Sequence, residues 1–221
     1  MESRDGIERQ WEQYRVSLSR FVPPRAVDEA YSFLRHHGVA MKVTRRRSTK
    51  LGDYRMPTEQ HKGHSISVNG DLNQYMFLMV LIHEMAHLQT FVDYGRRVQP
   101  HGRQWQENYR AMLCRYHQLG CFPSEVDGLM SKYTARIPMP RKTGSEIEFI
   151  LAHYGEAPGE IKAIRLKDLP VGTEFRMVSK PQILFKSLEK RRTRYCCVDV
   201  ARGMKYLVSG ESVVQPQGLV Q

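Results

Sequence analysis

Cysteine is scarce in this sequence, and its spacing suits neither metal binding nor crosslinking. Only four cysteines occur among 221 residues, and no two of them form a Cys-x-x-Cys pair. Neither a zinc ribbon nor a disulfide framework is therefore indicated. We expect free thiols in a reducing compartment: Cys114, Cys121, Cys196 and Cys197.

Long apolar runs are also missing. The longest, YMFLMVLI over residues 75–82, is far shorter than the roughly 20 residues that cross a bilayer. The N-terminus, MESRDGIERQWEQYR, has no apolar stretch that resembles a secretion signal. These absences predict a cytoplasmic protein with no membrane partner, and the nucleoid is an alternative location if DNA is a partner. The oligomeric state is left open.

Acidic residues are outnumbered by basic ones. Asp and Glu number 23 against 34 Lys and Arg, which gives a net charge of +11 and a pI near 9.6. Residues 160–221 hold 12 basic and 6 acidic side chains, so over half of the net charge lies in little more than a quarter of the chain. Such a charge is compatible with a polyanionic partner, nucleic acid above all.

The apolar pattern predicts an α+β domain over residues 1–140. From Val39 to Asp71, alternation and β-branched residues predict two or three strands of a small antiparallel sheet. Helical spacing predicts four helices, over residues 7–22, 27–37, 73–91 and 101–120.

A second region follows this domain. Residues 141–160 are rich in Pro and Gly and are predicted to form a linker. Residues 161–221 show five or so short alternating segments separated by Gly, Pro or charged turns. We expect a small all-β module there, a barrel or a sandwich.

The stretch LIHEMAHLQT, residues 81–90, places three titratable side chains in an apolar helix. His83 and His87 are four residues apart, so they project from one face on successive turns and can reach one ion. Glu84 stands to the side of that face, where it could take a proton from a water in an open coordination position. This pattern is typical of HExxH enzymes that bind one Zn²⁺ ion. The alternative is a core helix with two hydrogen-bonded histidines.

A zinc site of this type needs a third ligand, and His101 is the candidate. It opens the next predicted helix after a loop long enough to turn the chain back, between Pro100 and Gly102. Three imidazoles with an open position favour zinc over manganese or iron. Ahead of the motif, HSISVN (residues 64–69) reads as a strand that could form the edge along which an extended peptide binds.

These motifs resemble the SprT-like (Spartan-related) zinc metalloproteases over about residues 39–118. The similarity lies in TKLGDYRM and HSISVN ahead of the motif, in HEMAH itself, and in HGRQW about fourteen residues later. It implies a zincin-like fold, zinc held by His83, His87 and His101, and Glu84 as general base and acid. It also implies an endopeptidase acting on DNA-associated or DNA-crosslinked proteins, as in DNA–protein crosslink repair. Many members carry a four-cysteine zinc ribbon after this region, and this chain does not.

The basic module contains a candidate nucleic-acid surface in the run KSLEKRRTRYCC. Its cations would contact phosphates and its aromatic ring would stack on a base. The residues are Lys186, Lys190, Arg191, Arg192, Arg194 and Tyr195. The alternative is the solvated turn of a β-hairpin. Arg45–Arg47 could likewise line a groove beside the active site or only protect a strand edge.

The sequence places four other aromatic or histidine side chains of interest within about 25 residues of the motif. Trp105 and Tyr109 are expected in the core, with Tyr109 as a candidate to steady an oxyanion if it faces the cleft. His61 and His64 lie in a loop before a strand and are expected to be solvated.

Two other functions fit the sequence. One is a nucleic-acid-binding protein whose HExxH is a structural or vestigial zinc site without protease activity. The other is a zinc hydrolase acting on a non-peptide amide, which would need a deep closed pocket rather than an open groove.

Overall fold

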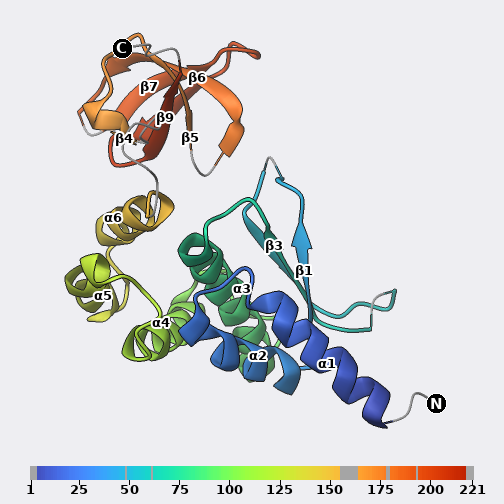
Figure 1. The fold of residues 1–221 in the computed structure, drawn as a ribbon. Coiled ribbons are helices and arrows are strands. Elements are labelled where there is room, and N and C mark those ends of the chain that lie inside the picture. The colour runs from blue at the N-terminus through green and yellow to red at the C-terminus, as the bar shows by residue number, and fades with distance from the viewer. Residues whose placement is uncertain are drawn as a thin grey trace. The chain divides into compact units, whose positions relative to one another are not determined.

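The computed structural model describes residues 4–47, 49–60, 62–154, 164–177, 180–192 and 194–217. The chain divides into two compact units (Figure 1). The first comprises residues 1–46 and 51–140, and the second comprises residues 47–50 and 141–221. Each unit contains helix and sheet, so the fold is α+β.

The first unit consists mainly of helices around a small sheet. Its elements are α1 (Arg4–Leu18), the 3-10 helix η1 (Pro24–Ala26), α2 (Val27–His36), β1 (Ala40–Thr44), β2 (Gly52–Arg55), β3 (Ser65–Asn69), α3 (Gln74–Tyr94), α4 (Arg103–Gln118), η2 (Ser124–Val126) and α5 (Asp127–Thr134).

The sheet of the first unit is mixed rather than antiparallel. Its order is β1-β3-β2, with β1 parallel and β2 antiparallel to β3. Because β2 lies in the connection between β1 and β3, the chain reverses twice and β3 runs in the direction of β1. Ile66 and Val68 of β3 are fully buried, which places this apolar strand at the centre and the polar β2 at an edge. The prediction of an antiparallel sheet is wrong for the β1–β3 pair.

Helix α3 forms the core of the first unit. The backbone N–H groups of Tyr75 and Met76 donate to the side chain of Asn73, which caps the helix, and α3 ends at Gly95, whose φ is 72°. By length and composition α3 could span a membrane, but 61% of its apolar window is buried inside the structure. It contacts β2, β3 and α4, as a core helix does.

The second unit joins one helix to a six-stranded sheet. Its elements are α6 (Arg141–Ala152), β4 (Ile164–Arg165), the 3-10 helix η3 (Leu166–Asp168), β5 (Glu174–Met177), β6 (Lys180–Lys190), β7 (Arg194–Asp199), β8 (Lys205–Ser209) and β9 (Val213–Gln217).

The strands of the second unit form one open antiparallel sheet, in the order β4-β9-β5-β6-β7-β8. Within the described residues β4 and β8 are its two edges, so the sheet is not closed into the predicted barrel. A sandwich would need two sheets, and the described strands form one. Strand β6 is 11 residues long, and its register with β7 shifts between Ser187 and Glu189. Such a bulge bends a strand, and the sheet is curved (Figure 1). Its core includes Phe175, Phe185 and Val214.

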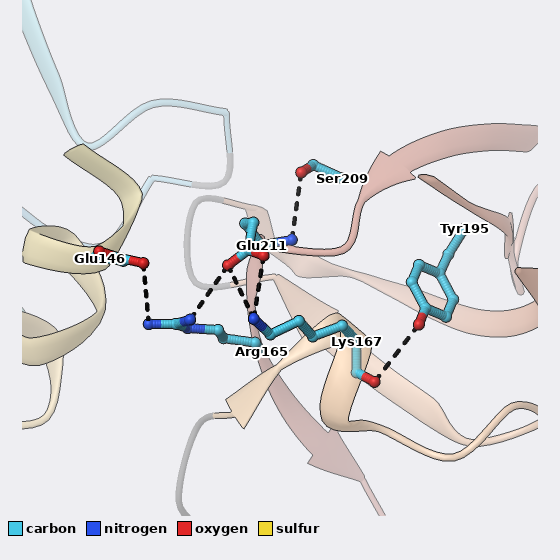
Figure 2. Close-up of polar contacts among 6 residues, drawn as sticks. All are labelled: Glu146, Arg165, Lys167, Tyr195, Ser209 and Glu211. Atoms are coloured by element: carbon cyan, nitrogen blue, oxygen red, sulfur yellow. Dashed lines mark hydrogen bonds and ion pairs between the residues drawn. The ribbon is translucent and has the colours of Figure 1, made fainter. Parts of the chain in front are cut away.

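The predicted linker over residues 141–160 begins as helix α6, and residues 155–160 lie outside the described part of the chain. Arg165 of β4 lies 3.8 Å from Glu146 of α6 (Figure 2). Its guanidinium also lies over the Phe149 ring. Arg165 and Lys167 both contact Glu211, at 3.3 and 3.1 Å. These contacts attach α6 to the sheet of its own unit.

Candidate metal site and the cleft beside it

Three histidine side chains meet between α3 and α4. The Nε2 atoms of His83 and His87 are 3.2 Å apart, and those of His101 are 3.1 Å from His87 and 3.0 Å from His83. His101 lies just before α4 with a φ of 58°, in the left-handed region that few non-glycine residues adopt. The backbone at His101 therefore turns its imidazole toward α3. The convergence predicted from the sequence is present in the structure.

The donor set fits a divalent cation. An ion about 2.0–2.1 Å from each Nε2, the usual zinc–imidazole length, would have N–metal–N angles of about 100°, close to tetrahedral. In a neutral imidazole each ring nitrogen is either a hydrogen-bond donor or an acceptor. Among three Nε2 atoms in mutual contact, at least two must therefore have the same role, both donors or both acceptors. The three contacts are therefore not all hydrogen bonds. This disfavours two ordinary core histidines, whereas one shared cation would satisfy all three lone pairs.

The imidazoles are held neutral. Burial, with smaller contributions from the neighbouring histidines, lowers the pKa of His83 to about 3 and that of His87 to about 4. Burial also lowers the pKa of His101. At neutral pH the three rings therefore present unprotonated nitrogens to a metal ion.

Two aromatic rings support the histidines. The Trp105 ring centroid lies 4.7 Å from that of His83 and 4.6 Å from that of His101, and Trp105 stacks on Tyr109 at 4.7 Å. Trp105 is 6% exposed and Tyr109 is 4% exposed. Both were expected in the core, as observed. Tyr109 is not among the residues that line the cleft, so it is not the phenol that would steady an oxyanion there.

Glu84 of α3 lies against β2 at Gly52. A Cβ added to Gly52 would lie 2.5 Å from Glu84 Oε1 and 2.6 Å from Val80 Cγ1. Only glycine lets β2 approach this closely. The sequence contains Gly52 within LGDY, but it does not reveal that this residue faces Glu84.

A cavity of about 400 Å³ opens beside these groups. Helix α3 supplies one wall, β2 another, and the segment of residues 95–101 a third. Its lining consists of Gly52, Asp53, Tyr54, Met56, His83, Glu84, His87, Thr90, Phe91, Gly95, Arg96, Val98, Gln99, Pro100, His101 and Trp105. The histidine cluster and Glu84 thus share one cleft with a strand edge.

That edge belongs to β2, whereas the sequence suggested HSISVN. The suggested strand is β3, which is central because its apolar residues are buried. The backbone N–H of Asn69 donates to Leu51 O at 2.9 Å, which makes Leu51–Asn69 a hydrogen-bonded pair of the antiparallel ladder. Gly52 and Tyr54 fall at the alternate positions, so their N–H and C=O groups point away from β3.

The candidate nucleic-acid residues divide into two sets in the second unit. Lys186, Lys190, Arg191, Arg192 and Arg194 are exposed on β6, β7 and their connection. Tyr195 is 5% exposed and packs in the core of the unit, so the expectation that its ring stacks on a base is wrong. Strand alternation accounts for this, because Tyr195 points to the face opposite that of Arg194.

Two other groups of residues from the sequence can be placed. Arg45 and Arg46 are exposed, Arg46 lies 3.4 Å from Asp71, and the described lining of the cleft includes none of Arg45–Arg47. His64 is half-buried rather than solvated, because it contacts Tyr54. His61 lies outside the described residues.

Fold and site together thus define a mainly helical domain that has a small mixed sheet and three clustered histidines. The model of the SprT-like family matches residues 25–121, which include β2, all of α3 and His101. The resemblance inferred from the sequence is confirmed over these residues. Comparison with curated proteins and with solved structures gives no match.

Proposed function

We propose that the protein is a zinc-dependent endopeptidase of the SprT-like type with a zincin-like catalytic domain. The observation that carries the proposal is the triangle of Nε2 atoms, 3.0–3.2 Å apart, in one cleft with Glu84. The family match supports a metalloprotease-type function for this domain.

His83, His87 and His101 would hold the metal ion, which would polarise the scissile carbonyl and lower the pKa of water. The buried carboxylate of Glu84 takes a proton from the attacking water and returns it to the leaving amine. Asp53 and Arg96 line the same cleft and would contact a bound chain.

The substrate is proposed to be an extended polypeptide. The N–H and C=O groups of Gly52 and Tyr54 that point away from β3 form a strand edge, and a peptide backbone can pair with this edge as an added strand. This feature favours a peptide over a small non-peptide amide, which would have no use for a strand edge.

Nucleic-acid binding by the second unit is a second proposed function. Lys190, Arg192 and Arg194 are exposed, and none of them has an ion pair with a described carboxylate. Uncompensated cations near a strand connection suit phosphate contacts. DNA-associated or DNA-crosslinked proteins are therefore the substrates that we propose to test first. A cytoplasmic location stays a prediction.

The test measures metal content and casein digestion, with and without single-stranded DNA. Glu84→Gln should retain one zinc ion per chain and lose hydrolysis, whereas His101→Ala should lose both. A chelator should abolish digestion and added zinc should restore it. Full activity of Glu84→Gln would refute its role, and salt-dependent DNA binding without any proteolysis would favour the binding function alone.

A further inference from the structure

We propose that Tyr54 is a catalytic residue of the cleft. Its hydroxyl donates a hydrogen bond to the substrate carbonyl oxygen as negative charge develops there, and His64 positions the phenol. This inference rests on the proposed endopeptidase function. It adds an uncharged hydrogen-bond donor to the groups that would act in the cleft.

Strand β2 places Tyr54 on the correct side. Side chains two residues apart on a strand share a face and lie about 6.6 Å apart along it. A Cβ at Gly52 would point at the carboxylate of Glu84, so Tyr54 also projects toward α3. Tyr54 and Glu84 both line the cleft. A peptide added along β2 would therefore pass over both side chains.

His64 fixes the orientation of the phenol. Tyr54 Oη lies 2.9 Å from His64 Nδ1, and the His64 ring packs edge-on against Phe91 of α3, with centroids 5.4 Å apart. Phe91 itself lines the cleft. When His64 Nδ1 carries the imidazole proton it donates to the phenolic oxygen, and the phenolic proton is left to point into the cleft.

The phenol also keeps its proton at neutral pH. Burial raises the pKa of Tyr54 to about 12, and burial lowers the pKa of His64. The pair is therefore a neutral phenol beside a neutral imidazole near pH 7. A donor held in place before the reaction stabilises a developing oxyanion more than the ground-state carbonyl, so it acts on kcat.

Kinetics of single variants test the assignment. Tyr54→Phe should lower kcat by roughly 10- to 100-fold and leave KM and zinc content unchanged. This loss is somewhat smaller than that caused by removing a donor from a fully enclosed oxyanion hole. His64→Ala should also lower kcat. His64→Asn, which keeps a donor near the Nδ1 position, should retain most of the wild-type kcat. The control is Tyr31→Phe, which removes an exposed hydroxyl 3.2 Å from Arg35 on α2 and should leave kcat unchanged.

Binding of an analogue gives a readout that does not need turnover. The probe is a phosphonate analogue of a cleaved peptide, whose tetrahedral oxygens mimic the oxyanion. Tyr54→Phe should weaken its binding by the same factor as it lowers kcat/KM. Binding of the intact peptide, measured in a Glu84→Gln background, should not change.

The outcomes separate this inference from the proposed function. An active wild type with an unchanged kcat in Tyr54→Phe overturns the role of Tyr54 and leaves the endopeptidase intact. A loss expressed only in KM, or accompanied by loss of zinc, also overturns it, because the phenol would then serve binding or folding. A wild type that holds zinc but hydrolyses no polypeptide overturns the proposed function, and this inference with it.

Discussion

Replacing Gly52 by alanine would place one methyl group against the carboxylate of Glu84. The added Cβ would lie 2.5 Å from Oε1 and 2.9 Å from Cγ of Glu84, whereas ordinary contacts begin at 3.4 Å. The glutamate must therefore move by about 0.9 Å, or β2 must retreat by as much. Cγ1 of Val80 would lie 2.6 Å from the same methyl, so a second side chain is crowded as well.

The expected cost falls on the reaction more than on the fold. A displacement of about 1 Å in a catalytic group can lower the rate by roughly 100-fold. Overpacking of this kind costs about 1–3 kcal/mol of folding free energy, which a domain of this size can tolerate. We expect Gly52→Ala to lower kcat on casein or a peptide about 100-fold, to keep one zinc ion per chain, and to remain folded.

The assay pairs kcat with zinc content and Tm. Gly63→Ala is the matched control, because a Cβ at Gly63 would meet nothing within 4 Å. It should change neither rate nor metal content. A Gly52→Ala enzyme within threefold of the wild type would show that Glu84 does not need its observed position, and the assignment of general base would lose its structural support.

Three further predictions concern stability and thiol chemistry. Asn73→Ala removes the acceptor for two backbone N–H groups at the start of α3 and should lower the free energy of unfolding by about 1 kcal/mol in a denaturant titration; no change would mean that other groups cap α3. Gly128→Ala, at an exposed position of α5 where an added Cβ would meet nothing within 4 Å, should raise that free energy by about 0.5–1 kcal/mol in the same titration. Burial raises the pKa of the Cys121 thiol to about 11 and that of Cys197 to about 12, so Ellman's reagent at pH 8 should modify both only after unfolding. Since these thiols ionise near 9.0 in the unfolded chain, stability should fall as the pH rises from about 9 toward 12, and four fast-reacting thiols in the native protein would contradict this.

The part of the site that depends on local geometry could be predicted from the sequence. His83 and His87 follow from helical spacing alone, because any helix over these residues puts both on one face. His101 could be named as the third member only from its place at the start of the next helix and from the resemblance to the SprT-like family. Its φ of 58° and its approach to the histidines of α3 are tertiary features that no local pattern encodes.

Strand alternation located the strands but not their neighbours. The pattern of HSISVN shows a buried face, and a central strand and an edge strand share that pattern. The stronger signal was the polarity of β2, whose residues are Gly, Asp, Tyr and Arg. In the second unit the pattern also located the strands. Whether the sheet closes into a barrel depends on whether β4 pairs with β8, and alternation does not encode a pairing between strands about 40 residues apart in the chain.

Register links the fold of the first unit to its chemistry. Gly52 pairs with Val68 and Tyr54 with Ile66, and both partners on β3 are fully buried. A slip of β2 by one residue would turn Gly52 and Tyr54 away from α3 and present Asp53 to Glu84 instead. Two carboxylates would then face each other where a glycine now leaves room for one. The buried face of β3 thus fixes which side of β2 meets the glutamate, and a core that holds no catalytic atom determines whether the cleft can work.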